Sequence, residues 1–496
     1  MTLRIRPTDG AIGSPPQQRS RFIYQFISCF CWLTAVILFP AKALSGEVDP
    51  YVGIYKADIG LIPYTVIKKH GHRYFAHVSP SSVELVIEEN GKFKAKNPNI
   101  DIHGQFNKKV GDQYHLKTVS LYGVRQAYRR EELNQKDYIS ALYSDSHAFS
   151  EFSHSVNEQC AAPYPDVSAA SEQLLESSPR MESLVRKIEG NRLDYGMINS
   201  LLVLKNGELL FERYFNGWDA NEPHMVLSVS KSLTSLLVGM AVKQGDIEDI
   251  NQSASSYLPE YKEYLEGERE KITLRHLLTM TPGLYWDQWS RLYEDARNLR
   301  SKEFDSDDSI AYVLSQPLSQ SPRDSFTYSG KAVSVMGEIL RVASKQSSVS
   351  KYAQKGPLSA LCFKNAFWIK QKDQRSNVAG GAVLRPRDML KLGQLVLNEG
   401  KWQGKQLFDS EWIKESTKPV LPTHTQGNKY SYFWWNTAYY HQGKKYPSIK
   451  AVGYGGQEIA IIKDLDLVVV KTANNFFSGS LIDKIVADSI LPTLVN

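Results

Sequence analysis

A serine and a lysine stand three residues apart in the stretch MVLSVSKSLTSLLVGMAV, which covers residues 225–242. On a helix, Ser228 and Lys231 would share one face with Cβ atoms about 5–6 Å apart, whereas Ser230 would point away. A serine hydroxyl is a weak nucleophile that needs a base, and a lysine amine can be that base once burial lowers its pKa. The spacing therefore predicts a nucleophile, Ser228, with a basic partner, Lys231. The alternative is that Ser228 only caps the helix.

Two later stretches carry residues that could complete such a site. Tyr328 in DSFTYSGKAVSVMGEIL precedes an amphipathic helix, and a phenol beside a lysine can relay protons; the alternative is a core aromatic with a hydrated hydroxyl. Gly453, Gly455 and Gly456 in VGYGGQEIAII precede a strand and indicate a close backbone approach. Their N–H groups could form half of an oxyanion hole, although a bulge or tight turn would use the same glycines.

The elements around these residues predict a sheet with a helical insertion. SLLVLKNGELLFERYF reads as a hairpin that turns at Asn206-Gly207. Helical segments follow the serine stretch to about residue 400, strands return in AVGYGGQEIAIIKDLDLVVVKTANN, and LIDKIVADSILPTLV is helical. Strands at both ends of this part imply one sheet shared by its two ends, with the helical middle to one side.

The chain divides into four parts by pattern. Residues 1–43 read as a signal peptide, 48–135 as a small β-barrel-like accessory domain, 136–178 as a linker or wrapping segment, and 179–496 as the chemical domain. Scattered histidines on the accessory domain suit exposed strand positions better than a metal site, so no metal and no cofactor are expected.

The N-terminus predicts export. Two arginines precede the apolar run FIYQFISCFCWLTAVILF, and AKA follows it as a small-x-small cleavage site. We expect a periplasmic or secreted protein; the alternative is an uncleaved anchor that keeps it at the membrane. Cys160 and Cys362 remain after cleavage and could either pair or stay as buried thiols.

Charge argues against one class of partner. The formal net charge is +6, of which residues 1–43 carry +4. The remaining +2 is small for the length, and no basic stripe stands out, so no nucleic-acid partner is expected.

Five blocks in order carry a family resemblance: LSVSKSLTSLLVGMAVKQGDI, ITLRHLLTMTPGLYW (272–286), the Tyr328 stretch, AGGAVLRPRDMLKLGQLVLNEGKWQGKQL (379–407) and GYGGQ. Together they resemble the serine β-lactamase and penicillin-binding-protein family. The class C β-lactamases, related esterases and 6-aminohexanoate-dimer hydrolases look most alike. The resemblance covers about residues 180–496. It implies a β-lactamase/transpeptidase-like fold of the α/β (α+β) class: an antiparallel sheet flanked by helices with a helical subdomain, here preceded by the small all-β domain.

The resemblance also implies roles. Ser228 would be acylated, with Lys231 and Tyr328 as proton-transfer partners. The backbone N–H groups of Ser228 and Gln457 would form the oxyanion hole. The residues implied or considered for substrate binding are Tyr454, Gly455, Gly456, Trp286, Asp287 and Trp289; for the last three, loop packing is the alternative.

Two departures from the family pattern affect the expected substrate. Gly330 stands where the family has an asparagine after the tyrosine, and Tyr454 stands where it has a lysine or histidine. The stretch Lys471–Ala473 resembles that third motif in letters but lies one strand too late and lacks its glycine. We therefore expect an exported serine hydrolase acting on a small-molecule or peptide-like amide or ester. The alternatives are a β-lactamase or D-alanyl carboxypeptidase, or a sensor that stays acylated.

Overall fold

A computed structural model describes most of the chain after residue 48. The described ranges are 49, 51–57, 64–78, 81–96, 102–108, 114–121, 124–131, 149–152, 178–190, 195–291, 295, 297–322, 325–425, 427–475 and 481–495. The predicted signal peptide and Cys160 lie outside these ranges, so the signal peptide and any pairing of Cys160 stay predictions. Within these ranges no helix is long and apolar enough to cross a bilayer.

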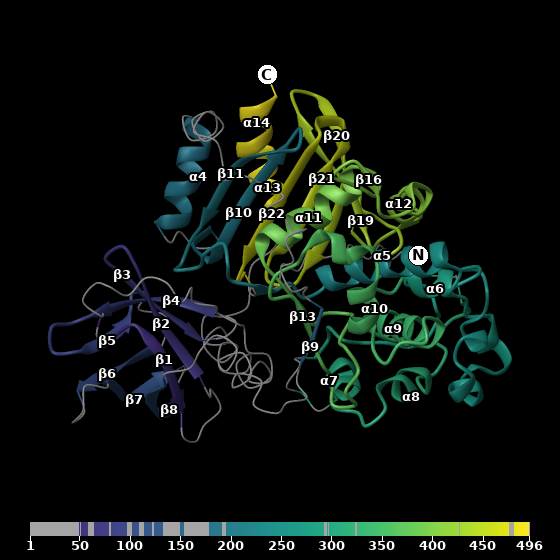
Figure 1. Cartoon of the computed structure of the whole chain (residues 1–496), viewed down its shortest axis with the longest axis horizontal. Coiled ribbons are helices and arrows are strands. Elements are labelled where there is room, and N and C mark those ends of the chain that lie inside the picture. The colour runs from purple at the N-terminus through teal and green to yellow at the C-terminus, as the bar shows by residue number, and fades with distance from the viewer. Residues whose placement is uncertain are drawn as a thin grey trace, which may run out of the picture.

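The N-terminal strands close into an antiparallel barrel, in which each strand pairs with the next and β8 returns to β1 (Figure 1). The strands are β1 (Gly53–Ala57), β2 (Tyr64–His70), β3 (Arg73–Val78), β4 (Ser81–Ile87), β5 (Lys92–Ala95), β6 (Ile102–Lys108), β7 (Tyr114–Leu121) and β8 (Val124–Glu131). Tyr55, Ile67, Phe93 and Phe106 belong to its apolar core. Closure leaves no strand edge open to other chains.

The main sheet has the strand order β11-β10-β22-β21-β20-β19-β18-β17. Its strands are β10 (Ile198–Lys205), β11 (Glu208–Tyr214), β17 (Leu421–Pro422), β18 (Lys429–Tyr430), β19 (Trp435–His441), β20 (Lys444–Gly453), β21 (Gln457–Ile462) and β22 (Leu467–Ala473). Asn206 and Gly207 have φ of 52° and 79°, as the predicted Asn-Gly hairpin requires. Pairing of β10 with β22 confirms that both ends of this part share one sheet.

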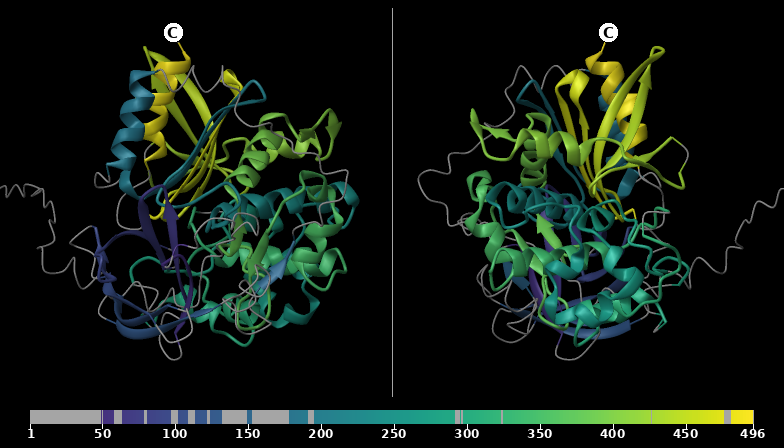
Figure 2. Two further views of the ribbon diagram at one scale, coloured as in Figure 1. Left: turned by 60° about the vertical axis from the view of Figure 1, so that its left-hand side comes forward. Right: turned by 90° about the vertical axis from the view of Figure 1, so that its right-hand side faces the viewer.

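Helices cover both faces of this sheet (Figure 2). Alternate residues of β10 divide between the two cores: Leu202 and Leu204 face one, and Leu201 and Val203 face the other. Helix α4 (Pro179–Glu189) and the C-terminal helices α13 (Ile482–Ile485), η7 (Val486–Ile490) and α14 (Leu491–Leu494) cover one face. Helices α5 (Val229–Gln244) and α11 (Pro386–Leu397) cover the other. The long helix α5 is therefore held between the sheet and the helical region.

The remaining short elements build the helical region and its connections. They are η1 (Tyr195–Met197), η2 (Ala254–Ser256), η3 (Pro259–Leu265), η4 (Gly267–Lys271), α6 (Leu274–Leu278), α7 (Leu299–Phe304), α8 (Ser309–Leu314), α9 (Lys331–Ala343), α10 (Val349–Lys355), η5 (Pro357–Leu361), β15 (Lys401–Trp402), β16 (Lys405–Gln406), α12 (Ser410–Thr417) and η6 (Lys463–Leu465). Helix α9 packs on α5, α6, α8 and α10, so it is the centre of the helical region.

Part of the predicted linker is a strand. A smaller sheet has the order β12-β14-β13-β9, built from β12 (His224–Met225), β14 (Ala382–Leu384), β13 (Phe367–Ile369) and β9 (Phe149–Glu151). Phe152 follows β9, is 1% exposed and contacts Trp368 at 4.1 Å between ring centroids. Burial of this aromatic ring outweighs the weak local pattern, so residues 149–152 add an edge strand to the small sheet, next to β13.

The barrel contacts the segment 215–224 through a buried ion pair. Lys68 of β2 pairs with Glu222, whose side chain is fully buried, and Ser82 donates to the Asn216 carbonyl at 2.6 Å. His77 lies edge-on to Trp218 at 5.1 Å between centroids. Because β12 and Ser228 follow directly along the chain, the barrel packs on the segment that leads into helix α5.

We predict that Lys68→Met destabilises the protein by about 3–5 kcal/mol, because it leaves the buried Glu222 carboxylate without its partner. The neighbouring Lys69 pairs with Asp49 at the surface and is the matched control. Lys69→Met should change stability little. Urea unfolding of both variants measures the difference; equal midpoints would mean that the barrel contact does not depend on this pair.

Candidate active site

Ser228 sits where β12 turns into α5. It is the N-cap residue of α5 and half-buried, and the preceding Leu227 has a φ of 47°. A left-handed conformation is costly for leucine, so the surrounding contacts must hold the turn. Ser230 supplies two of them: its hydroxyl donates to the Leu227 carbonyl at 2.5 Å and accepts from the Ala382 N–H at 2.9 Å. The second serine of the motif therefore fixes the turn, and the first is left at the helix N-terminus.

Lys231 lies beneath Ser228, on the same face of α5. Its Nζ donates to Ser228 Oγ at 2.9 Å and also to the Ala379 carbonyl, and the residue is 4% exposed. Burial, and to a smaller extent the Arg300 charge, lower the pKa of the Lys231 amine to about 7, against the opposing effect of Glu303. Near neutral pH a large share of this amine is therefore unprotonated, which is the form that can accept a proton.

Tyr328 comes next to the lysine from the loop before α9. Its ring centroid lies 5.2 Å from Lys231 Nζ and 5.3 Å from the centroid of Trp435. Tyr430 meets the Tyr328 ring at 90° with centroids 6.0 Å apart. The structure thus brings Ser228, Lys231 and Tyr328 together, with aromatic rings behind the tyrosine.

The glycine stretch approaches Ser228 from the end of β20. A Cβ atom on Gly453 would press on the Val226 carbonyl and lie 3.3 Å from Ser228 N. Gly456 has a φ of 92°, and a Cβ there would lie 2.7 Å from Lys471 Nζ. Gln457 opens β21, where its side chain bonds the Ala473 backbone. The strand end reaches the Ser228 N–H, while the oxyanion-hole role of the Gln457 N–H stays a prediction.

Lys471 has a structural position. It is fully buried on β22 and pairs with the equally buried Glu458 at 3.2 Å, directly behind the turn at Gly456. This placement fits the expectation that 471–473 does not replace the third motif.

The tryptophans after the 272–286 block have different environments. Trp286 is 7% exposed, and its Nε1 donates to Gln288 Oε1, which also accepts the Gly330 N–H at 2.9 Å. Trp286 therefore supports the loop that follows Tyr328 from within the core. Trp289 is 55% exposed and meets Tyr454 edge-on at 6.2 Å between centroids, so it is the ring open to solvent here.

Sequence reasoning missed the buried polar groups that support the lysine. Arg300, on α7, forms an ion pair with Glu303 at 2.5 Å and donates to Asn377 Oδ1 at 2.5 Å. Ser334 of α9 donates to Glu303. No sequence pattern pointed to Gln288 or Asn377. In the loop 377–381, only Ala379, Gly380 and Gly381 belong to one of the blocks that carry the family resemblance. One sequence feature could have indicated Arg300: Gly330 stands where the family has an asparagine, and the missing side chain leaves space that Arg300 fills.

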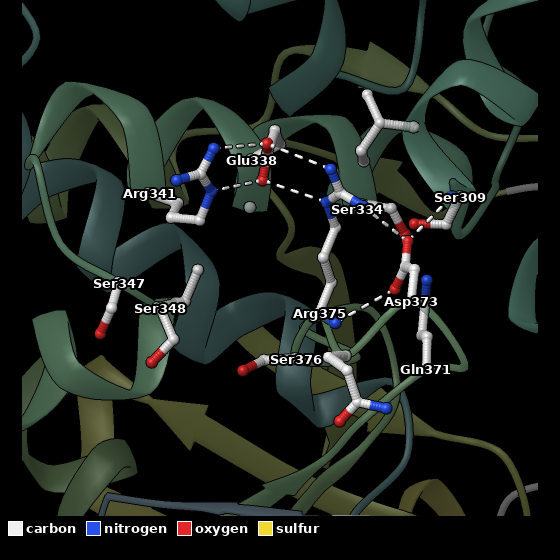
Figure 3. Close-up of a pocket in the computed structure, with 14 residues that line it drawn as sticks. Ser309, Ser334, Glu338, Arg341, Ser347, Ser348, Gln371, Asp373, Arg375 and Ser376 are labelled. Carbon is white, nitrogen blue, oxygen red and sulfur yellow. Dashed lines mark hydrogen bonds and ion pairs between the residues drawn. The ribbon is translucent and has the colours of Figure 1, made fainter. Parts of the chain in front are cut away.

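A polar cavity of about 280 Å³ is lined in part by Ser334, Glu338 and Arg341 of α9 (Figure 3). Arg375 bridges Glu338 and Asp373 across it, and Arg341 also bonds Glu338. These charges neutralise one another. Among the described residues no three His, Cys, Asp or Glu side chains gather as a metal site would require.

Comparison with known proteins finds curated relatives that match part of the chain and a solved structure with a similar fold. Protein flp of Staphylococcus aureus (strain COL) is 26% identical over 170 residues, which is 33% of each chain. Esterase EstB of Burkholderia gladioli is 31% identical over 162 residues, covering 29% of this chain and 40% of the esterase. The matches span between a third and two fifths of these relatives' length.

A solved structure assigned as a 6-aminohexanoate-dimer hydrolase of Bacillus anthracis superposes with a TM-score of 0.57 at 20% identity, covering 72% of this chain and 93% of that one. At that identity the likeness speaks for the fold. The family model described as Beta-lactamase matches residues 186–487, which include Ser228, Lys231, Tyr328 and the glycine turn. With well over half of its length matched, this chain belongs to the β-lactamase family and has the β-lactamase/transpeptidase-like fold.

Proposed function

We propose that the chain is a serine hydrolase that cleaves an ester or a linear amide through an acyl-enzyme on Ser228. The observation that carries the proposal is the 2.9 Å contact between Lys231 Nζ and Ser228 Oγ at a buried amine whose pKa is about 7. A base needs both hydrogen-bond reach to the proton it takes and a pKa near the working pH. The lysine has both.

The proposed reaction has two halves. Ser228 Oγ attacks the substrate carbonyl, Lys231 takes the hydroxyl proton, and the carbonyl oxygen becomes an oxyanion near the helix N-terminus and the end of β20. Collapse expels the alcohol or amine, which receives a proton by way of Lys231 and Tyr328. Water then attacks the acyl ester, gives a proton to the same groups and frees the acid with Ser228 restored.

The preference for esters and linear amides over β-lactams rests on two positions. Gly330 and Tyr454 offer neither the amide nor the cation that hold a β-lactam in relatives with the full motifs. Trp289 and Tyr454 instead present aromatic surface at the glycine turn. The name of the EstB relative agrees with an ester substrate.

We also propose that residues 1–43 are a signal peptide that directs export of the protein and is then cleaved. The disulfide-bonded state of Cys362 supports an oxidising compartment, because such bonds persist mainly outside the cytosol. Residues 48–135 and 179–496 would then form the mature accessory and hydrolase domains, joined through 136–178.

We predict that a fluorophosphonate adds once to the wild-type protein and not to Ser228→Ala, as measured by intact mass. Ser235→Ala is the matched control, since Ser235 is a buried serine about two turns further along the same helix. It should keep the adduct. Absence of label on the wild-type protein, or label that persists on Ser228→Ala, would contradict the proposal.

Penicillin in the same experiment separates the alternatives. We expect no stable penicillin adduct. A stable adduct would favour an acylated sensor or penicillin-binding protein, and rapid loss of intact penicillin would favour a β-lactamase.

We predict that kcat/KM for a 4-nitrophenyl ester rises with pH through an apparent pKa of about 7. The lowered pKa of Lys231 means that its amine is protonated and inactive below this value and is free to accept a proton above it. Lys231→Ala should lose about 10²–10⁴-fold in kcat. A flat profile between pH 5 and 9 in the wild-type protein would remove Lys231 as the base.

A further inference from the structure

Position 330 lacks a side chain at a place where another residue fills the space. Gly330 is buried, has φ −70° and ψ −35°, and so needs no glycine for its backbone conformation. A Cβ atom there would lie 3.2 Å from both Cδ and Nε of Arg300 and 3.3 Å from its Cζ. The guanidinium of Arg300 therefore covers the backbone at Gly330, which is 30 residues further along the chain and follows the loop of Tyr328.

Arg300 is anchored on two sides. Its Nη2 donates to Asn377 Oδ1 at 2.5 Å, and its Nη1 lies 2.5 Å from Glu303 Oε2. Glu303 is fully buried and also accepts the Ser334 hydroxyl at 2.5 Å. A planar guanidinium with fixed partners has little freedom to leave this place.

The loop 377–381 connects this guanidinium to the lysine. Asn377 accepts the Gly381 N–H through its own carbonyl at 2.7 Å, which closes the loop. At the centre of the loop, the Ala379 carbonyl accepts from Lys231 Nζ. Thr234, one turn further along α5, donates to the Val378 carbonyl at 3.1 Å. The carbonyl that orients the amine is thus fixed from the Arg300 side and from the helix side.

We propose that Arg300 is a positioning residue for the Ser228–Lys231 pair, which takes the space of the side chain missing at Gly330, fixes the loop that orients the lysine amine and holds a permanent positive charge beside it. This inference rests on the proposed function, since it names a further part of the same site.

The charges around the Lys231 amine predict the direction in which each substitution shifts its pKa. Arg300 lowers the pKa of Lys231, and Glu303 raises it. Glu303 also faces Lys331, whose amine is buried at the start of α9, and Tyr312 on α8. Loss of Arg300 should therefore make the Lys231 amine harder to deprotonate, and loss of the Glu303 charge should make it easier.

The test follows the acidic limb of the pH–rate profile. The readouts are the fluorophosphonate labelling rate and 4-nitrophenyl ester hydrolysis. We expect Arg300→Gln to move the limb up by about one pH unit, Glu303→Gln to move it down by about one unit, and the double variant to lie between. Arg300→Lys keeps the charge and should leave the limb in place while lowering the rate, because the two-sided anchoring is lost.

A swap variant tests the occupied space. Gly330→Asn alone should reduce the labelling rate about tenfold or more, since its side chain meets the guanidinium. In an Arg300→Ala background the same asparagine has room and should raise the rate above that of Arg300→Ala. Thermal unfolding of each variant separates a loss of folding from a loss of rate.

Two outcomes would overturn the inference while leaving the proposed function intact. One is that Arg300→Gln and Glu303→Gln both lower the reaction rate without moving the acidic limb of the pH–rate profile, or that both move this limb in the same direction. The other is that Gly330→Asn lowers the rate equally in both backgrounds. A wild-type protein that neither labels nor hydrolyses would instead contradict the proposed function itself.

Discussion

The arrangement of the site depends on one constraint: the Lys231 amine has been taken out of water. An ammonium group in that position loses hydration that a single carbonyl and a hydroxyl cannot replace, so the neutral form becomes accessible near pH 7. Everything packed against α5 contributes to this. The sheet covers one side of the helix, α9 another, and the chain at 149–152 closes the small sheet that leads to Ser228.

Three residues around the Ser228–Lys231 pair have strained backbone conformations. Leu227, Met280 and Phe433 all have positive φ, and each contributes its carbonyl to a side chain or backbone group of the site region. Ser230 bonds Leu227, Thr327 bonds Met280, and Ser232 bonds Phe433. The cost of such conformations is met by close packing in a rigid core, which is why they persist around a site that must hold its geometry.

Local chemistry predicted the centre of this site well and its support poorly. The Ser-x-x-Lys spacing placed Ser228 and Lys231 on one helix face, and the Asn206-Gly207 turn and late strands gave the shared sheet. Arg300, Gln288 and Asn377 could not be found this way, because the contacts that join them to the site are long-range: Arg300 bonds Asn377, 77 residues away, and Gln288 bonds Gly330, 42 residues away. For Trp286 the sequence leaves both substrate binding and loop packing open; its burial and its hydrogen bond to Gln288 agree with loop packing. Residues 149–152 looked like linker because four residues are too short for a periodic pattern.

The order of strands in the main sheet has a consequence for synthesis. Strand β22 lies between β10 and β21, so the earliest strand of this sheet gains its inner neighbour only when the last strand has been made. The barrel strands, by contrast, pair mostly with their sequence neighbours and can close as soon as β8 is made. During translation a finished barrel would therefore precede an unfinished hydrolase domain for some 340 residues. Helix α5 packs on β20 and β21, which are also made late, so until these strands enter the sheet one side of α5 lacks its cover and the Lys231 amine stays exposed to water.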